Sequence, residues 1–316
     1  MKTRIELLLL LTCLAIHLGC GSGASISITP SNPAPTGTTS GATVPQLGHT
    51  FLVIEENHSF GGVVGNSAMP YFNQLATKYG LATQYFADAH PSLPNYFVLT
   101  TGQTITFDDA FSGTVAQDNV VRELVAAGKT WKVYAESLPA VGWTGGDVLP
   151  YVKHHNPAAY FSDVLNSPTQ AANLVPFSQF PGDLASSRLP NYSLIIPNLQ
   201  NDAHDCPAAI PNCTDNQKLA AADAWLSANI APLVNSALFQ QDGLLIIVFD
   251  EGDATDLSNV GGRVAMLVIS PRAKQGFQST AFYQHQSTLR LMLDALGVGV
   301  RPGAAATAPS AAEFFQ

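Results

Sequence analysis

Five short runs of apolar residues along the chain predict the strands of a sheet. They cover residues 50–54, 131–135, 192–196, 244–249 and 264–270, and the run at 131–135 is the weakest because a lysine interrupts it. Val, Ile, Leu and Phe follow one another in the other runs without polar alternation. Such strands fit a parallel sheet that is covered on both faces.

Segments with helical spacing of apolar residues lie between these runs. Apolar positions recur every three or four residues in residues 70–79, 119–127, 217–238 and 284–296. Strands that alternate with helices predict an α/β sandwich, with a largely parallel central sheet and helices on both faces. No internal repeat is visible in the sequence.

Polar side chains follow three of the predicted strands directly. Glu56 and Asn57 come after the first run, His204 lies in the segment after residues 192–196, and Asp250 and Glu251 follow residues 244–249. The carboxyl ends of parallel strands meet at one edge of a sheet, where ligands bind. Carboxylate and amide oxygens suit hard divalent cations, and imidazole extends the range to zinc. The alternative is that these acidic residues cap helices and form turns.

A candidate nucleophile lies in the segment His-Pro-Ser-Leu-Pro-Asn-Tyr at residues 90–96. Ser92 would stand near the N-terminus of a short helix that ends at Gly102, with Pro94 in its first turn. Backbone N–H groups at such a terminus favour an anion, for example a phosphate. Asn95 could donate an amide hydrogen bond to a phosphate oxygen. The alternative is that Ser92 only caps the helix.

Several further polar residues are candidates for lining a cleft. His154 and His155 could bind metal or donate to phosphate, and His285 stands at the start of the last predicted helix. Glu136 follows the weakest strand, and Arg263 could bind a phosphate with two hydrogen bonds. Each of these residues could equally be a surface residue or a core residue with satisfied hydrogen bonds.

Composition excludes two classes of protein. The chain has 316 residues, of which 46% are hydrophobic and 12% charged, which excludes a wholly disordered protein. The formal net charge is −9 and no run of Lys or Arg occurs, so we expect no nucleic-acid partner.

The first residues predict an export signal. Lys2 and Arg4 precede an apolar stretch at residues 7–16, which is shorter than the roughly 20 residues that a membrane span needs. We therefore interpret residues 1–20 as a signal peptide. Leu-Gly-Cys at residues 18–20 resembles the end of a bacterial lipoprotein box, which makes Cys20 a candidate for lipid attachment, although ordinary cleavage nearby is the alternative. The protein is expected to be exported, in the periplasm or on the outer surface, with a membrane tether if Cys20 is lipidated.

The rest of the chain divides by composition. Residues 21–47 are rich in Ser, Thr and Pro and predict a flexible linker, residues 48–300 the folded domain, and residues 301–316 a loosely held tail rich in Ala and Pro. Cys206 and Cys213 are the only cysteines outside the targeting segment. A close pair suits a disulfide in an oxidising compartment, and the alternative of a metal site lacks a second cysteine pair.

Four motifs together resemble a known family. They stand in the same order as in that family, at residues 54–59 (IEENHS), 90–96 (HPSLPNY), 197–205 and 249–253 (FDEGD). The chain resembles the bacterial phosphoesterase family that contains acid phosphatases and phosphatidylcholine-type phospholipases C, over roughly residues 49–298. Four ordered motifs are a far stronger signal than any one of them.

The resemblance implies an alkaline-phosphatase-like fold and a set of site residues. It implies a nucleophile at Ser92 and a divalent metal ion, whether calcium, magnesium, manganese or zinc. The implied metal ligands are Glu56, Asn57, Ser92, Asp250 and Glu251. His204 and His155 are implied near the substrate, where either could protonate the leaving group, and Asn95, His154 and His285 are the candidate substrate-binding residues.

The activity that we expect is metal-dependent hydrolysis of phosphate monoesters through a phosphoserine intermediate, of the acid phosphatase type. The segment after Asp253 is too short for an added lid domain, and the chain is compact beside the larger phospholipases C. Arg263 departs from the family pattern, which affects the choice of substrate. One alternative is a phospholipase C-type phosphodiesterase that cleaves phospholipid head groups. Another is an exported, non-catalytic binding protein, against which the intact set of site residues argues.

Overall fold

The computed structural model describes residues 42–315. The predicted signal peptide, the lipidation candidate Cys20 and most of the predicted linker lie outside the described residues. Leu47, at the end of the predicted linker, is already part of the folded unit: its side chain is buried and its N–H donates to the carbonyl of Ala295 at 2.7 Å. None of the helices in the described part is long and apolar enough to cross a membrane.

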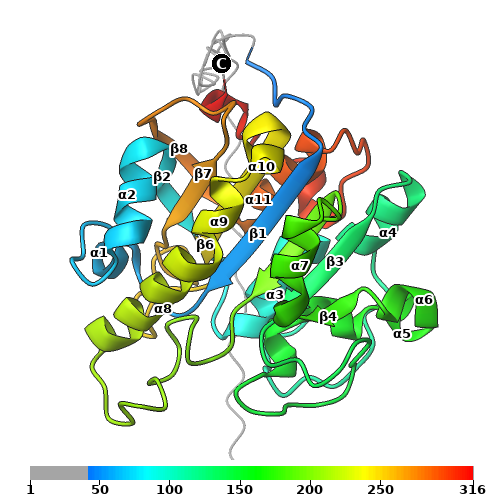
Figure 1. The fold of residues 1–316 in the computed structure, drawn as a ribbon, viewed down its shortest axis with the longest axis horizontal. Coiled ribbons are helices and arrows are strands. Elements are labelled where there is room, and N and C mark those ends of the chain that lie inside the picture. Colours follow the sequence, from blue (N-terminus) through cyan, green and yellow to red (C-terminus); the bar gives the residue numbers. More distant parts are fainter. Residues whose placement is uncertain (1–41, 316) are drawn as a thin grey trace, which may run out of the picture. The chain divides into compact units, whose positions relative to one another are not determined.

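An eight-stranded sheet lies at the centre, in the order β4-β3-β5-β1-β6-β7-β2-β8 (Figure 1). β7 is antiparallel to both of its neighbours, and all other neighbouring strands are parallel. Every strand except β7 therefore ends at the same edge of the sheet. The strands are β1 His49–Glu55, β2 Gly80–Phe86, β3 Trp131–Ala135, β4 Leu174–Pro176, β5 Tyr192–Ile196, β6 Gly243–Phe249, β7 Met266–Ile269 and β8 Gln278–Gln284.

Helices cover both faces of the sheet. Figure 1 shows α2, α8, α9 and α10 in front of the strands and α3 and α11 behind them. The α-helices are α1 Phe60–Val63, α2 Pro70–Lys78, α3 Ser92–Thr101, α4 Val120–Ala126, α5 Ser162–Leu165, α6 Pro168–Ala171, α7 Phe180–Ala185, α8 Asp215–Asn229, α9 Ala231–Val234, α10 Ala237–Asp242 and α11 His285–Ala295. Short 3-10 helices are η1 Lys153–His155, η2 Pro157–Tyr160, η3 Phe177–Gln179, η4 Gly303–Ala306 and η5 Ala312–Phe314.

The predicted fold class is confirmed, with a mixed and mostly parallel sheet. All seven residues of β6 are buried, as are six of the seven in β1, in keeping with a sheet covered on both faces. The prediction of a single helix over residues 217–238 is wrong, because this segment forms three helices. It is divided into α8, α9 and α10, because Pro232 has no N–H to donate and the Ser236 side chain caps α10 by accepting from Phe239 N at 3.2 Å.

The sequence pattern did not predict three strands. β4 has only three residues, too few to show a period. β2 contains Thr83 and Gln84 in place of an unbroken apolar run, and β8 is an edge strand in which exposed and buried residues mix. Their pairing with distant strands, rather than local hydrophobicity, defines them.

The tail expected to be loosely held is packed into the fold. Phe314 and Phe315 are buried, Phe315 forms a β-bridge with Ala273, and the carboxylate of Glu313 accepts a hydrogen bond from Tyr283 at 2.7 Å. The many Ala and Pro residues predicted looseness, but the two terminal phenylalanines bury enough apolar surface to hold the segment in place.

Candidate active site

The first site residues directly follow β1 at the carboxyl edge of the sheet. Glu56 is fully buried, and the backbone at Asn57 has a φ of +53°, a left-handed conformation that asparagine tolerates better than most residues. This turn lets the Asn57 N–H donate to Asp250 Oδ1 at 3.1 Å. The end of β1 is thereby joined to the end of its neighbour β6.

Ser92 is the first residue of α3, in the segment that follows β2. Its Oγ lies 3.0 Å from Glu56 Oε2 and 3.4 Å from Glu251 Oε1, and only 4% of the residue is exposed. The next backbone N–H, that of Leu93, donates to Asp109 Oδ1 at 2.8 Å. The helix N-terminus thus binds an anion as predicted, but that anion is a carboxylate of the chain itself.

Asp250 and Glu251 follow β6 on the other side of Ser92. Asp250 is fully buried and Glu251 is 7% exposed. Glu251 Oε2 lies 2.6 Å from Nδ1 of His90, whose Nε2 in turn lies 3.1 Å from the carbonyl oxygen of Asp256. His90 therefore fixes the orientation of the Glu251 carboxylate toward Ser92.

Four carboxylates are buried together in this region, and their ionisation is costly. Burial raises the pKa of Asp250 to about 6, that of Asp202 to about 8 and that of Glu251 to about 9, where the charge of Asp250 adds to the effect. Burial, and then the charges of Asp250 and Asp202, hold the pKa of Glu56 well above its usual range. Within residues 42–315 no Lys or Arg forms an ion pair with any of the four. A cluster of this kind needs a cation or protons to be stable.

The arrangement of oxygen atoms fits a divalent cation. The terminal atom of the Asn57 amide that faces the cluster lies 3.1 Å from both Glu56 Oε2 and Glu251 Oε1, and 3.3 Å from both Asp250 Oδ1 and Ser92 Oγ. Asp250 Oδ2 is buried without a hydrogen-bond partner. The amide can donate to these oxygens in one orientation, whereas in the other its own oxygen joins them as a ligand. The set offers oxygen atoms almost throughout, which suits calcium, magnesium or manganese.

A second group of possible ligands shares Glu56. Glu56, His155 and Asp202 are all buried, and one potential ligand atom of each lies within 4.8 Å of the others. His155 Nε2 is 3.4 Å from Glu56 Oε1, and its Nδ1 is 3.5 Å from Asp202 Oδ2. Burial lowers the pKa of His155 to about 3, so the ring is neutral and can offer a lone pair. This buried Glu/His/Asp group could bind a metal ion. The His155 ring also stacks on the ring of Tyr96, with centroids 5.0 Å apart, and the Tyr96 hydroxyl donates to Glu56.

His204 and His154 lie outside the buried cluster. His204 is partly exposed and lines a cavity of about 280 Å³ together with Asn57 and Glu251. Its Nδ1 lies 2.8 Å from Asp205 Oδ1, which fixes the ring and leaves Nε2 free to carry a proton toward a leaving group. His154 contacts His155 edge-on, and burial lowers its pKa to about 4. Of the two candidate acids, His204 is the one with access to a cavity, since His155 is only 1% exposed.

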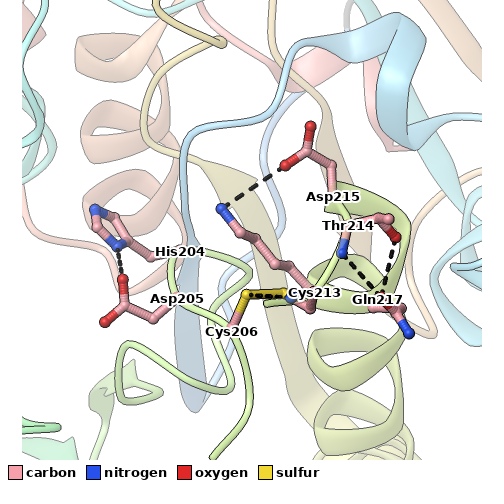
Figure 2. Close-up of a disulfide and its surroundings, with 8 residues drawn as sticks. His204, Asp205, Cys206, Cys213, Thr214, Asp215 and Gln217 are labelled. Atoms are coloured by element: carbon pink, nitrogen blue, oxygen red, sulfur yellow. Dashed lines mark hydrogen bonds and ion pairs between the residues drawn. A yellow bond between two sulfur atoms is a disulfide. The ribbon is translucent and has the colours of Figure 1, made fainter. Parts of the chain in front are cut away.

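The predicted disulfide is present beside His204 (Figure 2). Cys206 and Cys213 are bonded, with their Cα atoms 5.5 Å apart, and the sulfur of Cys206 also accepts from the Cys213 N–H at 3.0 Å. The bond closes the loop between β5 and α8. Because His204 and Asp205 directly precede Cys206, the disulfide restrains the segment that carries this histidine.

Two predicted substrate-binding residues are used in another way. The Asn95 amide accepts from the N–H groups of Asp88 and Ala89 and donates to the carbonyls of Ala89 and Pro91, at 2.8–3.2 Å. All of its hydrogen-bonding capacity is therefore spent on the loop before Ser92, and the residue is fully buried. The prediction that Asn95 binds phosphate is not supported, because no donor remains for a substrate.

His285 is likewise fully buried, and its Nδ1 lies 3.0 Å from the Tyr85 hydroxyl while its Nε2 contacts the Asp250 carbonyl. It supports the backbone of Asp250 and has no free nitrogen for a substrate. Glu136 accepts from the N–H of Asn198 at 3.0 Å, and Arg263 Nε donates to Thr83 O at 2.9 Å while its guanidinium lies over the Phe60 ring. Neither of these two residues reaches the cluster around Ser92.

The sequence pattern left four residues of this site without a role. His90 orients Glu251, Tyr96 contacts Glu56, Asp109 binds the α3 N-terminus, and Asp202 completes the second group of ligands. For Tyr96 a signal was available. Ser92, Asn95 and Tyr96 are spaced at helical intervals of three and four residues, which places them on the same side of α3. Asp109 carried no such signal, because its position depends on the path of a long loop.

Comparisons with known proteins point to enzymes that act on phosphate esters. A family model described as the Phosphoesterase family matches residues 63–299. The phosphatidylinositol-3-phosphatase of Mycobacterium tuberculosis is 35% identical over 219 residues, which cover 69% of this chain and 68% of that protein. An acid phosphatase of Aspergillus fumigatus is 32% identical over 248 residues, or 76% of this chain and 52% of that protein. The chain thus spans about half the length of that fungal relative.

Solved structures show the same fold at low sequence identity. A protein of the alkaline phosphatase superfamily from Vibrio parahaemolyticus aligns with a TM-score of 0.60 at 16% identity, over 85% of this chain and 72% of that chain. The phosphonate monoester hydrolase of Agrobacterium radiobacter aligns with a TM-score of 0.53 at 14% identity, over 79% of this chain and 74% of that chain. These likenesses concern the arrangement of the strands and helices.

Proposed function

Because this chain belongs to the phosphoesterase family and is a hydrolase of phosphate esters, we propose that it releases phosphate from monoesters through a phosphoserine at Ser92. The observation that carries the proposal is the position of Ser92 Oγ, 3.0 Å from Glu56 Oε2 within a buried cluster of carboxylates. A serine that only capped a helix would not need a cluster of buried carboxylates around its hydroxyl group. Both relatives named above are phosphatases, which favours monoesters over the phosphodiesters of a phospholipase C.

The residues that would hold a divalent cation are Glu56, Asn57, Asp250 and Glu251, next to the Ser92 oxygen. When bound, the cation would supply positive charge that favours the ionised serine and stabilises the phosphoryl oxygens. The chain itself orients the nucleophile. Asn95 holds the loop before Ser92, and His90 holds the Glu251 carboxylate.

The reaction then follows in two displacements. Ser92 Oγ attacks phosphorus in its ionised form, the bond from phosphorus to the ester oxygen breaks, and the alcohol leaves with a proton from His204. Water next attacks the phosphoserine and gives its proton to His204, the bond from phosphorus to Ser92 Oγ breaks, and inorganic phosphate and the ionised Ser92 are released. His204 fits this role because it lines the same cavity as Asn57 and Glu251.

A phosphate-release screen tests this proposal. The purified protein is assayed on an aryl phosphate monoester and on a matched diester, after chelation and after addition of calcium, magnesium, manganese or zinc. We expect phosphate from the monoester only, loss of activity on chelation and recovery with at least one cation. Preferred cleavage of the diester would support the phospholipase C alternative, and equal turnover with and without chelator would contradict the metal requirement.

Ser92→Ala is expected to lower kcat by about 1000-fold or more, because the group that attacks phosphorus is removed. The matched control is Ser112→Ala, which changes an exposed serine in the loop after α3 and should leave kcat unchanged. Circular dichroism and the urea midpoint would show that both variants are folded. A Ser92→Ala protein with parental kcat would rule out the phosphoserine.

A further inference from the structure

Four large apolar side chains are more exposed than any others in the described part of the chain. Leu149 is 74% exposed, Leu257 71%, Phe107 67% and Val260 62%. Single exposed apolar residues are ordinary on protein surfaces and would scatter over helices and strands. These four instead lie in three loops, at residues 103–115, 137–152 and 250–262, and all three loops reach the site.

Contacts near the site fix the position of the first two loops. Phe107 stands two residues before Asp109, whose carboxylate accepts from the N–H next to Ser92. Leu149 precedes Pro150, whose carbonyl accepts from the N–H of Leu199 at 3.2 Å, just beyond the end of β5. Both side chains therefore belong to the edge of the sheet that carries the nucleophile.

The third loop begins with the site residues Asp250 and Glu251 themselves. Leu257 follows Asp256, whose carbonyl oxygen lies 3.1 Å from His90 Nε2. Val260 precedes Gly261, whose carbonyl accepts from the N–H of Gly252 at 2.8 Å. This loop is thus folded back on the site, with its apolar side chains directed to solvent.

The charge of these loops is negative throughout. None of the three contains Lys or Arg, and each carries an exposed aspartate, namely Asp108, Asp147 and Asp253. A partner that is attracted by charge, such as nucleic acid or an anionic membrane, would be repelled here. What the loops offer is exposed apolar side chains among carboxylates.

We propose that Phe107, Leu149, Leu257 and Val260 insert into a lipid surface of neutral or zwitterionic head groups, so that the site faces phosphate esters held there. A protein partner is recognised through a packed, complementary surface. None of the four side chains lines either cavity beside His204, so neither cavity offers a packed pocket in which a protein partner would contact them. A fluid lipid layer accepts isolated apolar side chains, and each one buried there contributes to binding. The inference rests on the proposed function, and it narrows the substrates to amphiphilic monoesters.

Flotation with vesicles of pure phosphatidylcholine tests the inference. The protein is the full chain with Cys20→Ser, so that no lipid can be attached at that position. The test variant adds Leu149→Ser and Leu257→Ser, and the matched control adds Val125→Ser and Val300→Ser, which are 45% and 56% exposed. Val125 lies in the last turn of α4, which leads into the start of β3. Val300 follows α11, whose Ala295 carbonyl accepts from the N–H of Leu47 just before β1, so both control residues lie toward the opposite edge of the sheet from the site.

We expect the test variant to lose vesicle binding by about tenfold or more, while the control binds as the parent does. Replacing part of the phosphatidylcholine with phosphatidylserine should not strengthen binding. Equal flotation of test variant and control, absence of binding by the parent, or binding that needs the anionic lipid would each overturn the inference. Phosphate release from a soluble aryl phosphate is measured in parallel and should be the same in all three proteins. Its absence in the parent would count against the proposed function and not against the docking surface.

Discussion

At the scale of single residues, hydrogen-bonding capacity separates substrate-binding groups from those that shape the site. Asn95 and Ser92 stand three residues apart in one motif, and the sequence suggested contact with the substrate for both. The structure distinguishes them because every donor and acceptor of Asn95 is already used by the backbone of residues 88–91. Whether all hydrogen-bonding groups of a side chain are used in this way depends on the path of the loop, which cannot be inferred from the type of residue.

Asn95→Ala should therefore act on stability and on kcat more than on KM. It leaves buried N–H and carbonyl groups of the loop before Ser92 without partners, and we expect a loss of about 2–4 kcal/mol in the free energy of unfolding. kcat for an aryl phosphate should fall with the displaced nucleophile, while KM should change by less than about threefold. Urea unfolding and steady-state kinetics measure the two effects. A variant of parental stability with a strongly raised KM would return Asn95 to the role of a phosphate ligand.

At the scale of secondary structure, prediction succeeded where local pattern decides and failed where distant packing does. The strands at residues 131–135 and 192–196 match β3 and β5, because each is a short apolar run between polar segments. β2 and β8 pair with one another and are held by neighbours far along the chain, so their polar residues concealed them. The break between α8 and α10 was visible in principle, because Pro232 and Ser236 are the residue types that interrupt and start helices.

The terminal segment gives a prediction at this scale. Phe314 is fully buried, and its ring packs edge-on against Phe277 with centroids 5.4 Å apart. Phe314→Ala should cost about 3–5 kcal/mol in the free energy of unfolding, because it removes a buried ring and leaves a cavity. Val300→Ala, at a site that is 56% exposed, is the control and should cost less than about 0.5 kcal/mol. Equal urea midpoints for the two variants would show that the segment is loosely held after all.

At the scale of the whole molecule, the fold brings together carboxylates from separate strand ends, and none of them forms an ion pair with Lys or Arg in the described structure. The sequence predicted this convergence, because parallel strands deliver their following residues to one edge. It could not show how deeply the group is buried, which depends on helices on both faces. The depth of burial of these carboxylates matters, because burial raises the pKa values of Asp202 and Glu251 to about 8 and about 9.

Stability of the metal-free protein should consequently fall as the pH rises from 7 to 9. Unfolded Asp and Glu are ionised above roughly pH 5, whereas folded Asp202 and Glu251 still hold protons at pH 7, so the folded state binds more protons and loses stability as they leave. The buried histidines are neutral in the folded state and lose only their last protons in the unfolded state above pH 7, so they offset a small part of this loss. Thermal unfolding in the presence of a chelator measures the effect.

A bound divalent cation should reverse this trend, because ionised carboxylates are its ligands. Thermal unfolding with the cation that restores activity should show little loss between pH 7 and pH 9. Glu251→Gln, which cannot ionise, is the matched variant and should reduce the loss seen with chelator. Metal-free protein whose melting temperature stays constant or rises over this range would contradict the account of a buried acidic cluster.

The central claim is that Ser92 becomes covalently phosphorylated within this cluster, and mapping of the trapped enzyme tests it most directly. The protein is mixed with an excess of an aryl phosphate, quenched in acid within the first turnovers, digested and analysed by mass spectrometry. We predict one phosphoryl group on the peptide that contains Ser92 in cation-loaded protein, and none after chelation or in Ser92→Ala. Undiminished phosphate release from the Ser92→Ala protein, with the phosphoryl group on another residue or on none, would contradict the claim.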